Sequence, residues 1–325
     1  ACVAARNYNF NEPYPEALYK MVEEQKAEVN EYEHLWRYMP LDTHTEEDIL
    51  YLFQRIANLP QSFNTLIHIV AMMLLWGGVK DNIKKLRKFI EEEITKRLDE
   101  FSKLAKDDDY WHVLRKILED NANPAFAKEI MRSILLLIEQ SNDMHYKSYN
   151  IKDCMELLIG KYFNEVWHDL SEALVCDGER YILYYKLKSI LGSMTGYNNG
   201  AGILFQTEHN DDLLAWCKKY PLVAPERLML MVPLYGENGF SDIVYKLVNL
   251  YGEQDTVLTA LSCNMGSFSF VGSIVPLYEK QLRCIEGLSN HNSEKVRTWS
   301  VKMSTYLKEQ IDVEKNRDAE GVLNR

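Results

Sequence analysis

Two pairs of residues in the sequence have the spacing of a carboxylate-bridged metal site. Glu31 and His34 are three residues apart, and so are Glu165 and His168. Residues three apart share one face of an α-helix, and helical di-metal proteins combine two Glu-x-x-His pairs with further glutamates from neighbouring helices. In a chain rich in glutamate such spacings also arise by chance. We therefore expect no bound metal, and a helical metal-dependent hydrolase or oxidase is the alternative.

The other chemical motifs are incomplete. His168 and Asp169 form the His-Asp dipeptide of a helical phosphohydrolase class, but no pattern supplies the further histidine and aspartate that its metal site requires. The three aspartates at 107–109 lack the second acidic position of a magnesium motif and more simply cap the next helix. The chain has no Gly-Lys-Ser/Thr phosphate loop and no Gly-x-Ser-x-Gly nucleophile motif. We expect no catalytic residue and no cofactor.

Composition and charge limit the class of protein and its partners. Among 325 residues there are only 15 Gly and 9 Pro, which favours helices over turn-rich β-structure. The formal charge of −11 disfavours broad binding to nucleic acid or to anionic membranes and favours a protein partner with basic patches. The six scattered cysteines and the lack of a long apolar run predict a cytoplasmic protein without membrane spans.

Hydrophobic spacing predicts helices along the whole chain and no strands. We expect an all-α fold, an α-solenoid of stacked antiparallel helical hairpins with an irregular N-terminal half. Helices are predicted at 15–39, 45–60, 63–76, 83–104, 107–121, 124–140, 151–175 and 178–191, and then as pairs at 211–219 with 225–235, 241–251 with 254–264, and 273–288 with 293–311. The first helices of these pairs begin about 30 residues apart, as stacked hairpins require.

The same pattern suggests a division of the chain. An irregular helical-repeat region is expected at 1–191, a loop or hinge at 192–206, regular hairpins at 207–312, and a charged, frayed tail at 313–325. The segment 192–202, "GSMTGYNNGAG", contains four glycines and two asparagines and is the clearest interruption of the helical pattern.

One hairpin resembles a HEAT repeat. Residues 272–307 read "GSIVPLYEKQLRCIEGLSNHNSEKVRTWSVKMSTYL". Pro276 stands at the repeat's first-helix proline, and Val296 and Arg297 match its Val-Arg pair, with Trp299 facing inward from the second helix. Asn290 departs from the usual aspartate. The resemblance implies structural roles for Pro276, Val296, Arg297 and Trp299. In that family the arginine bonds in a ladder between successive turns. Because Asn290 replaces the aspartate, the alternative is that Arg297 bonds a carbonyl or Glu294 instead of forming the ladder.

A wider stretch, about 207–320, resembles a C-terminal module of large bacterial proteins. It includes "LLAWCKKYPLVAPERLMLMVPLY" and "LYGEQDTVLTALSCNMGSFSFVGSIVPLYEKQL". We associate that module with ATPases of the signal-transduction class used in antiviral defence. The resemblance implies the partner-recognition end of a larger ATP-dependent protein.

The chain is therefore interpreted as a non-catalytic protein-interaction or sensing scaffold. Tyrosine, phenylalanine and asparagine side chains in loops and tyrosine-rich turns are the candidates for partner contact, and packing between helices is their alternative role. The candidate interaction residues are Tyr184, Tyr185, Tyr197, Asn198, Asn199, Phe268 and Phe270.

Overall fold

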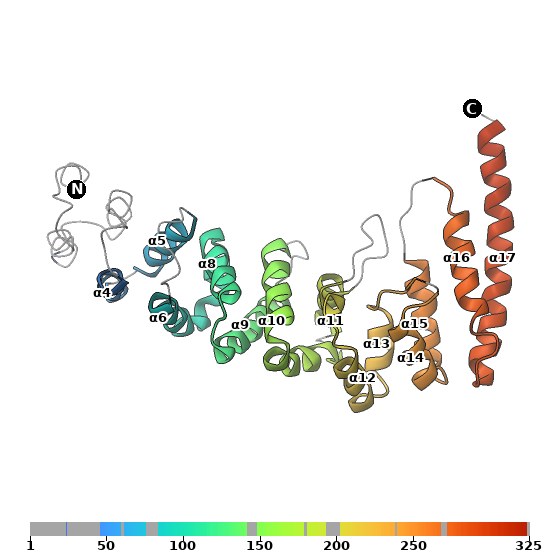
Figure 1. Cartoon of the computed structure of the whole chain (residues 1–325), viewed down its shortest axis with the longest axis horizontal. Helices are drawn as coiled ribbons and strands as arrows, with labels where there is room; N and C mark the ends of the chain where they lie inside the picture. The colour runs from blue at the N-terminus through green and yellow to red at the C-terminus, as the bar shows by residue number, and fades with distance from the viewer. Residues whose placement is uncertain are drawn as a thin grey trace. The chain divides into compact units, whose positions relative to one another are not determined.

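The all-α prediction is confirmed in a computed structural model. It describes Glu24 and residues 46–59, 62–75, 84–141, 148–178, 181–192, 202–237, 239–267 and 272–323. Every regular element in these ranges is helical (Figure 1), and the only extended pairing there is an isolated antiparallel bridge between Tyr235 and Phe240. Within the same ranges, no helix has both the length and the apolar character needed to cross a bilayer. The helix predicted at 15–39 lies outside the described residues.

Contacts divide the chain into two units. The first contains the described residues as far as Gln140 together with 148–166, and the second contains Ser141 and the described residues from Trp167 onward. The division falls within a single helix, shortly after a kink at Tyr162. It does not coincide with the hinge predicted at 192–206, of which only Gly192 and residues 202–206 are described, so that hinge stays a prediction.

The first unit follows the predicted helices closely. Its elements are α4 (Glu46–Ala57), α5 (Phe63–Leu75), α6 (Lys84–Thr95), the 3₁₀ turn η2 (Leu98–Glu100), α7 (Phe101–Leu104), α8 (Asp108–Glu119), α9 (Pro124–Gln140) and the first part of α10 (Ser148–Leu174). The nearly all-apolar α5 is covered on most sides and packs on α8. Predicted caps are present: Asp107 accepts from the Asp109 amide at 2.9 Å and Asn123 from the Ala125 amide at 2.9 Å.

The single helix predicted over 83–104 is divided in the structure into α6 and α7, with the 3₁₀ turn η2 between them. Arg97 Nη1 donates to the carbonyl oxygen of Glu93 at 2.9 Å and to its carboxylate at 2.7 Å. The Arg97 guanidinium also lies 4.6 Å from the ring centre of Phe63. The backbone amide of Arg97 bonds instead to Ile94 O, which is the tighter 3₁₀ spacing. The side chain therefore occupies the carbonyl that would have continued the α-helix.

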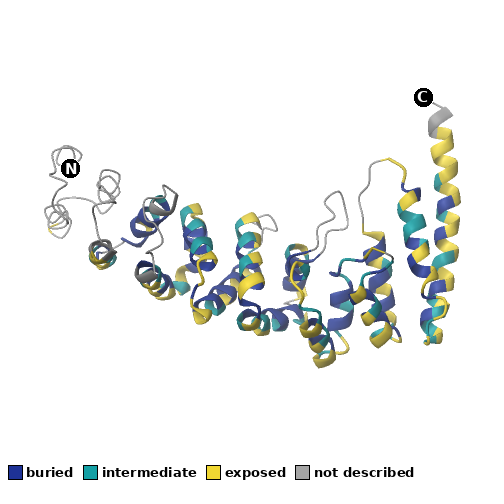
Figure 2. Cartoon of the chain, in the orientation of Figure 1, coloured by how far each residue is buried: buried dark blue, intermediate teal, exposed yellow. Residues whose placement is uncertain are grey.

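The second unit contains shorter helices. They are the end of α10, α11 (Tyr181–Leu191), the 3₁₀ turn η4 (Ile203–Phe205), α12 (Asn210–Lys219), α13 (Ala224–Met229), α14 (Asp242–Tyr251), α15 (Asp255–Gly266), α16 (Val275–Glu286) and α17 (Glu294–Leu323). In Figure 2 the buried residues of most of these helices lie on one side and the exposed residues on the other.

Two helix ends in this unit correct the sequence-based expectation. The helix predicted at 225–235 ends at Met229, because a proline at 233 disfavours helical geometry just before it. The freed carbonyls of Met229 and Val232 accept hydrogen bonds of 2.8 and 3.1 Å from the Asn264 amide. The helix predicted at 293–311 continues as α17 to Leu323, so it extends through most of the segment 313–325 for which fraying is predicted.

Helices α16 and α17 form an antiparallel hairpin. Ser300 Oγ donates to Ile285 O near the turn, and an ion pair joins Lys315 to Glu279 farther along at 3.0 Å. Ser273, which precedes α16, donates to Asp318 near the end of α17. These pairs run in opposite directions along the two helices. The last turns of α17 are nevertheless largely exposed (Figure 2).

Arg227 of α13 joins three segments of the second unit. Its side chain is 5% exposed. The guanidinium donates to Leu174 O at 2.6 Å, to Cys176 O at 3.0 Å and to the Asp177 carboxylate at 2.5 Å. It also lies over the ring of Tyr184 in α11, 4.7 Å from the ring centre. This one side chain therefore satisfies the carbonyl end of α10 and holds α11 against α13.

We predict that Arg227→Met lowers the free energy of unfolding by about 2–4 kcal/mol, since two buried carbonyls lose a charged donor. Urea unfolding followed by near-ultraviolet circular dichroism measures the change. Arg283→Met, on an exposed arginine of α16, is the matched control and should change stability by no more than about 0.5 kcal/mol. Equal losses in the two variants would show that Arg227 has no special role.

Glu91 of α6 is a buried carboxylate in the first unit. Its side chain is 11% exposed and accepts from the Asn123 amide at 3.3 Å, while Arg87 Nε lies 3.7 Å away. Burial outweighs these favourable contacts and raises the pKa of the Glu91 carboxyl above its ordinary value. The ionised form is therefore less favourable in the folded protein than in the unfolded chain.

A raised pKa of Glu91 has a definite sign for stability. The stability that Glu91 contributes to the folded protein through this shift is fully present below the ordinary glutamate pKa of about 4.3. It is lost as the pH rises through the pKa that Glu91 has in the folded protein. We predict that Glu91→Gln, which keeps an acceptor oxygen for Asn123, is as stable as the wild type at low pH and more stable at neutral pH. Thermal unfolding midpoints measured from pH 3.5 to 7.5 test this. A pH-independent difference between the two proteins would contradict it.

Candidate functional site

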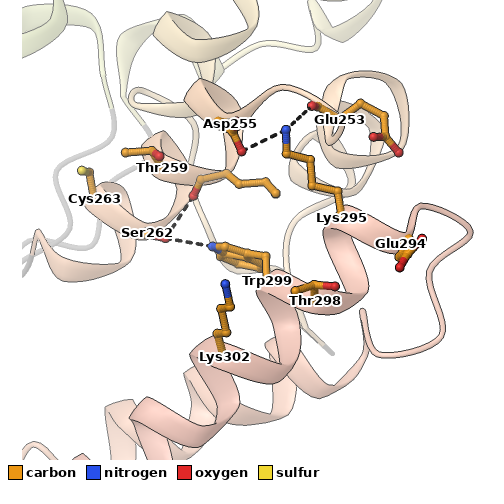
Figure 3. A pocket seen from close by; sticks show the side chains of 11 residues that line it. Glu253, Asp255, Thr259, Ser262, Cys263, Glu294, Lys295, Thr298, Trp299 and Lys302 are labelled. Carbon is orange, nitrogen blue, oxygen red and sulfur yellow. Dashed lines mark hydrogen bonds and ion pairs between the residues drawn. The ribbon is translucent and has the colours of Figure 1, made fainter.

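A groove between α15 and the start of α17 is one candidate binding surface of the second unit (Figure 3). It has a volume of about 840 Å³. One wall comes from α15 and the turn before it, with Thr259, Ser262 and Cys263, and the other comes from α17, with Thr298 and Trp299. Lysines and carboxylates stand on its rims.

The turn that begins α17 is held by Arg297. Its guanidinium donates to His291 O at 2.7 Å and to Asn292 O at 2.8 Å, both in the turn that precedes its own helix. Of the bonds expected from the HEAT resemblance, the carbonyl one is present. The ladder to a neighbouring turn and the bond to Glu294 are not among the hydrogen bonds that Arg297 makes with described residues. Arg297 thus closes the hairpin turn locally.

Val296 and Gly252 set how closely α17 approaches α14. Val296 is fully buried, and a Cβ added at Gly252 would lie 2.6 Å from Val296 Cγ2 and 2.5 Å from Val248 O. Only a residue without a side chain fits there. Pro276 is the second residue of α16, at an exposed position where a missing amide is tolerated.

Trp299 is the central side chain of the groove. Its indole Nε1 donates to Ser262 Oγ at 3.1 Å, and Ser262 in turn donates to Leu258 O at 3.0 Å. These bonds fix the half-exposed ring against α15 (Figure 3). A rigid tryptophan with its polar edge satisfied is the kind of side chain that dominates binding energy at protein interfaces.

The charges of the groove are unevenly paired. Lys295 forms an ion pair with Asp255 at 2.9 Å and donates to Glu253 O at 2.8 Å. Lys302, one turn after Trp299, makes no hydrogen bond or ion pair with another described residue. Its ammonium group points toward the indole ring in Figure 3. The groove therefore combines an aromatic face, one paired carboxylate at Asp255, the carboxylates of Glu253 and Glu294, and one available cation.

Of the predicted interaction residues, only the two in α11 are described. Tyr184 is fully buried and donates to Arg227 O at 3.3 Å, so its ring serves packing. Tyr185 is 48% exposed and lies edge-to-face with Tyr181, with ring centres 4.9 Å apart. Tyr197, Asn198, Asn199, Phe268 and Phe270 lie outside the described residues.

The residues considered for metal binding do not form a site in the described part of the chain. No group of three or more His, Cys, Asp or Glu side chains that could hold a metal ion is found there. Glu165 is half-buried and His168 is exposed on α10. Glu31 and His34 lie outside the described residues, so whether the two pairs converge stays open.

One wall of the groove could have been predicted from residue spacing in the sequence, although the HEAT pattern gives the same segment a structural interpretation. Lys295, Trp299 and Lys302 have the spacing i, i+4, i+7 and so share one stripe of α17. That stripe marks one wall only, because the α15 wall depends on how two helices pack.

The chain matches no protein-family model, no curated protein and no solved structure.

The close approach at Gly252 leads to a matched pair of substitutions. We predict that Gly252→Ala destabilises the protein by about 1–3 kcal/mol, because the added methyl group overpacks the α14–α17 contact. Gly160→Ala in α10, where an added Cβ meets nothing within 4 Å, should instead stabilise by about 0.5–1 kcal/mol through helix propensity. Urea unfolding of both variants measures the two signs. A stabilising effect at Gly252 would contradict the packing described for the groove.

Proposed function

We propose that the chain is an α-solenoid scaffold that binds other proteins and carries out no catalysis itself. Among the described residues, most side-chain hydrogen bonds between different helices join positions between 32 and 53 residues apart, and the shorter ones, at 15 and 16 residues, link consecutive helices. Examples are the bonds from Tyr162 to Leu118 and from Trp216 to Ser171, at separations of 44 and 45 residues. This distribution is the observation that carries the proposal.

The separation supports a repeat array because it is close to one repeat length. In stacked helical repeats each hairpin contacts its neighbours only, and HEAT-type repeats are about 40–47 residues long. The helix pairs that pack most extensively within a unit are also near neighbours in the chain, such as α16 with α17 and α13 with α15. A single-core globular domain would bring together residues much farther apart in sequence.

Binding rather than chemistry suits such an array. Stacked hairpins present extended surfaces, and the groove around Trp299 is preformed. The chain's net charge of −11 favours protein partners with basic patches. We further propose that the chain is cytoplasmic, on the basis of its scattered cysteines. We also propose that it acts as the partner-recognition region of a larger bacterial ATP-dependent defence or signalling protein, and this part rests on the sequence resemblance alone.

Small-angle X-ray scattering of the purified chain tests the solenoid. A compact globule of 325 residues has a radius of gyration of about 20 Å. We predict a clearly larger value and a pair-distance distribution with a long tail, without the scattering signature of an unfolded chain. A symmetric distribution with a radius near 20 Å would contradict the proposal. Near-stoichiometric iron, manganese or zinc in the same chromatographic peak, measured by elemental mass spectrometry, would favour the metal-dependent enzyme instead.

A further inference from the structure

A second groove of the second unit differs from the Trp299 groove in its charge. It lies where η4 and the segment after it meet the turn between α13 and α14, and it has a volume of about 560 Å³. We call it the acidic groove. Glu208, Glu237 and Asp242 supply its carboxylates, and Phe205, Phe240 and Tyr245 supply its rings. None of the residues that line it is lysine or arginine.

The three carboxylates of the acidic groove are uncompensated. All three residues are exposed, and none of the carboxylates takes part in an ion pair or hydrogen bond with another described residue. Lys246 lies one turn along α14 from Asp242 and forms no ion pair with it. The contrast with Asp255, which Lys295 neutralises, is clear.

Helix polarity accounts for only part of this charge. Asp242 is the first residue of α14, where the helix dipole favours a carboxylate. Glu208 and Glu237 lie outside helices and gain nothing from that effect. Three carboxylates around one hollow repel one another, and a cation placed among them removes that repulsion.

The rings give the groove a second property that a bare acidic cluster lacks. Phe205 and Tyr245 are half-exposed at its surface, and Tyr245 is held edge-to-face on the buried Phe240 with ring centres 5.9 Å apart. Aromatic faces attract lysine and arginine heads and cover their apolar stems. A hollow of this size admits one or two side chains rather than a folded domain.

We propose that the acidic groove binds lysine or arginine side chains of a segment of a partner protein. This inference rests on the proposed function, because it names the chemistry of one partner contact of the scaffold. Charge complementarity argues for this occupant, since an acidic peptide or a nucleic acid would add to the existing repulsion.

Fluorescence anisotropy with a labelled peptide of alternating arginine and glycine tests the proposal. We expect saturable binding that weakens with salt and is lost when citrulline, which is neutral and similar in shape, replaces each arginine. The triple variant Glu208→Gln, Glu237→Gln, Asp242→Asn should weaken binding about 10-fold or more, since three ion pairs are removed.

A second triple variant controls for overall charge. Glu309→Gln, Asp312→Asn and Glu320→Gln remove the same three charges from the exposed face of α17 and should change the affinity less than about twofold by comparison. Equal weakening in both triple variants would assign binding to net charge and overturn the proposal. So would binding of the citrulline peptide, or displacement of the arginine peptide by millimolar Ca²⁺ or Mg²⁺ at constant ionic strength, which would indicate a metal site.

The wild-type chain provides a measurement that needs no variant. Hydrogen exchange with bound arginine peptide should slow at 203–210 and 234–245, and slowing confined to other segments would contradict the proposal. The result is independent of the scattering experiment. A compact chain that binds the peptide at this groove would contradict the solenoid proposal and support the binding proposal. An elongated chain that does not bind the peptide would support the solenoid proposal and contradict the binding proposal.

Discussion

The fold depends on finding hydrogen-bond donors for the carbonyl oxygens that its helix ends leave exposed. Short helices end often, and each end leaves carbonyls with no partner inside the helix. Here the donors come from long polar side chains about one hairpin away, because few glycines are available to close the ends. The bonds from Tyr162 to Leu118, Trp216 to Ser171 and Arg227 to Leu174 are of this kind, and Lys295 bonds in the same way to Glu253 in the turn after α14. Each one joins a helix to a carbonyl of the preceding hairpin.

This constraint also explains which residues remain available for partners. A polar side chain that reaches a neighbouring carbonyl is committed to the scaffold, as Arg227 and Tyr184 are. Lys302, at the edge of the Trp299 groove, makes no such bond to a described residue. Partner binding in a helical array is therefore expected at the polar groups that take no part in contacts between hairpins. Burial distinguishes side chains that hold the scaffold together from side chains available to a partner better than residue type does.

Helix caps and the burial of single helices were predictable from sequence, and contacts between hairpins were not. The caps at Asp107 and Asn123 and the covered helix α5 follow from residues within one or two turns. The break after α6 combines local bonds from Arg97 to Glu93 with a contact between Arg97 and Phe63 of α5, and helical spacing predicted neither the contact nor the break. The end of α17 was expected to fray because its charges look solvated, but Lys315 and Asp318 have partners in and just before α16.

The same distinction applies to the grooves. The aromatic residues attracted attention in the sequence because tyrosine and phenylalanine are common at interfaces, yet Tyr184 proved to be core. Charged side chains differ from the aromatic ones, because some of their pairings can be found from sequence spacing. A carboxylate such as Glu93, which pairs with Lys96 and Arg97 three and four residues farther along the chain, can be matched to its partners from spacing. A carboxylate such as Glu208 or Glu237 has no partner at helical spacing, and only the fold shows that these two lie beside Asp242. Unpaired charge gathered by the tertiary structure is thus the feature that sequence reasoning misses and that most directly distinguishes a binding surface from a solvated one.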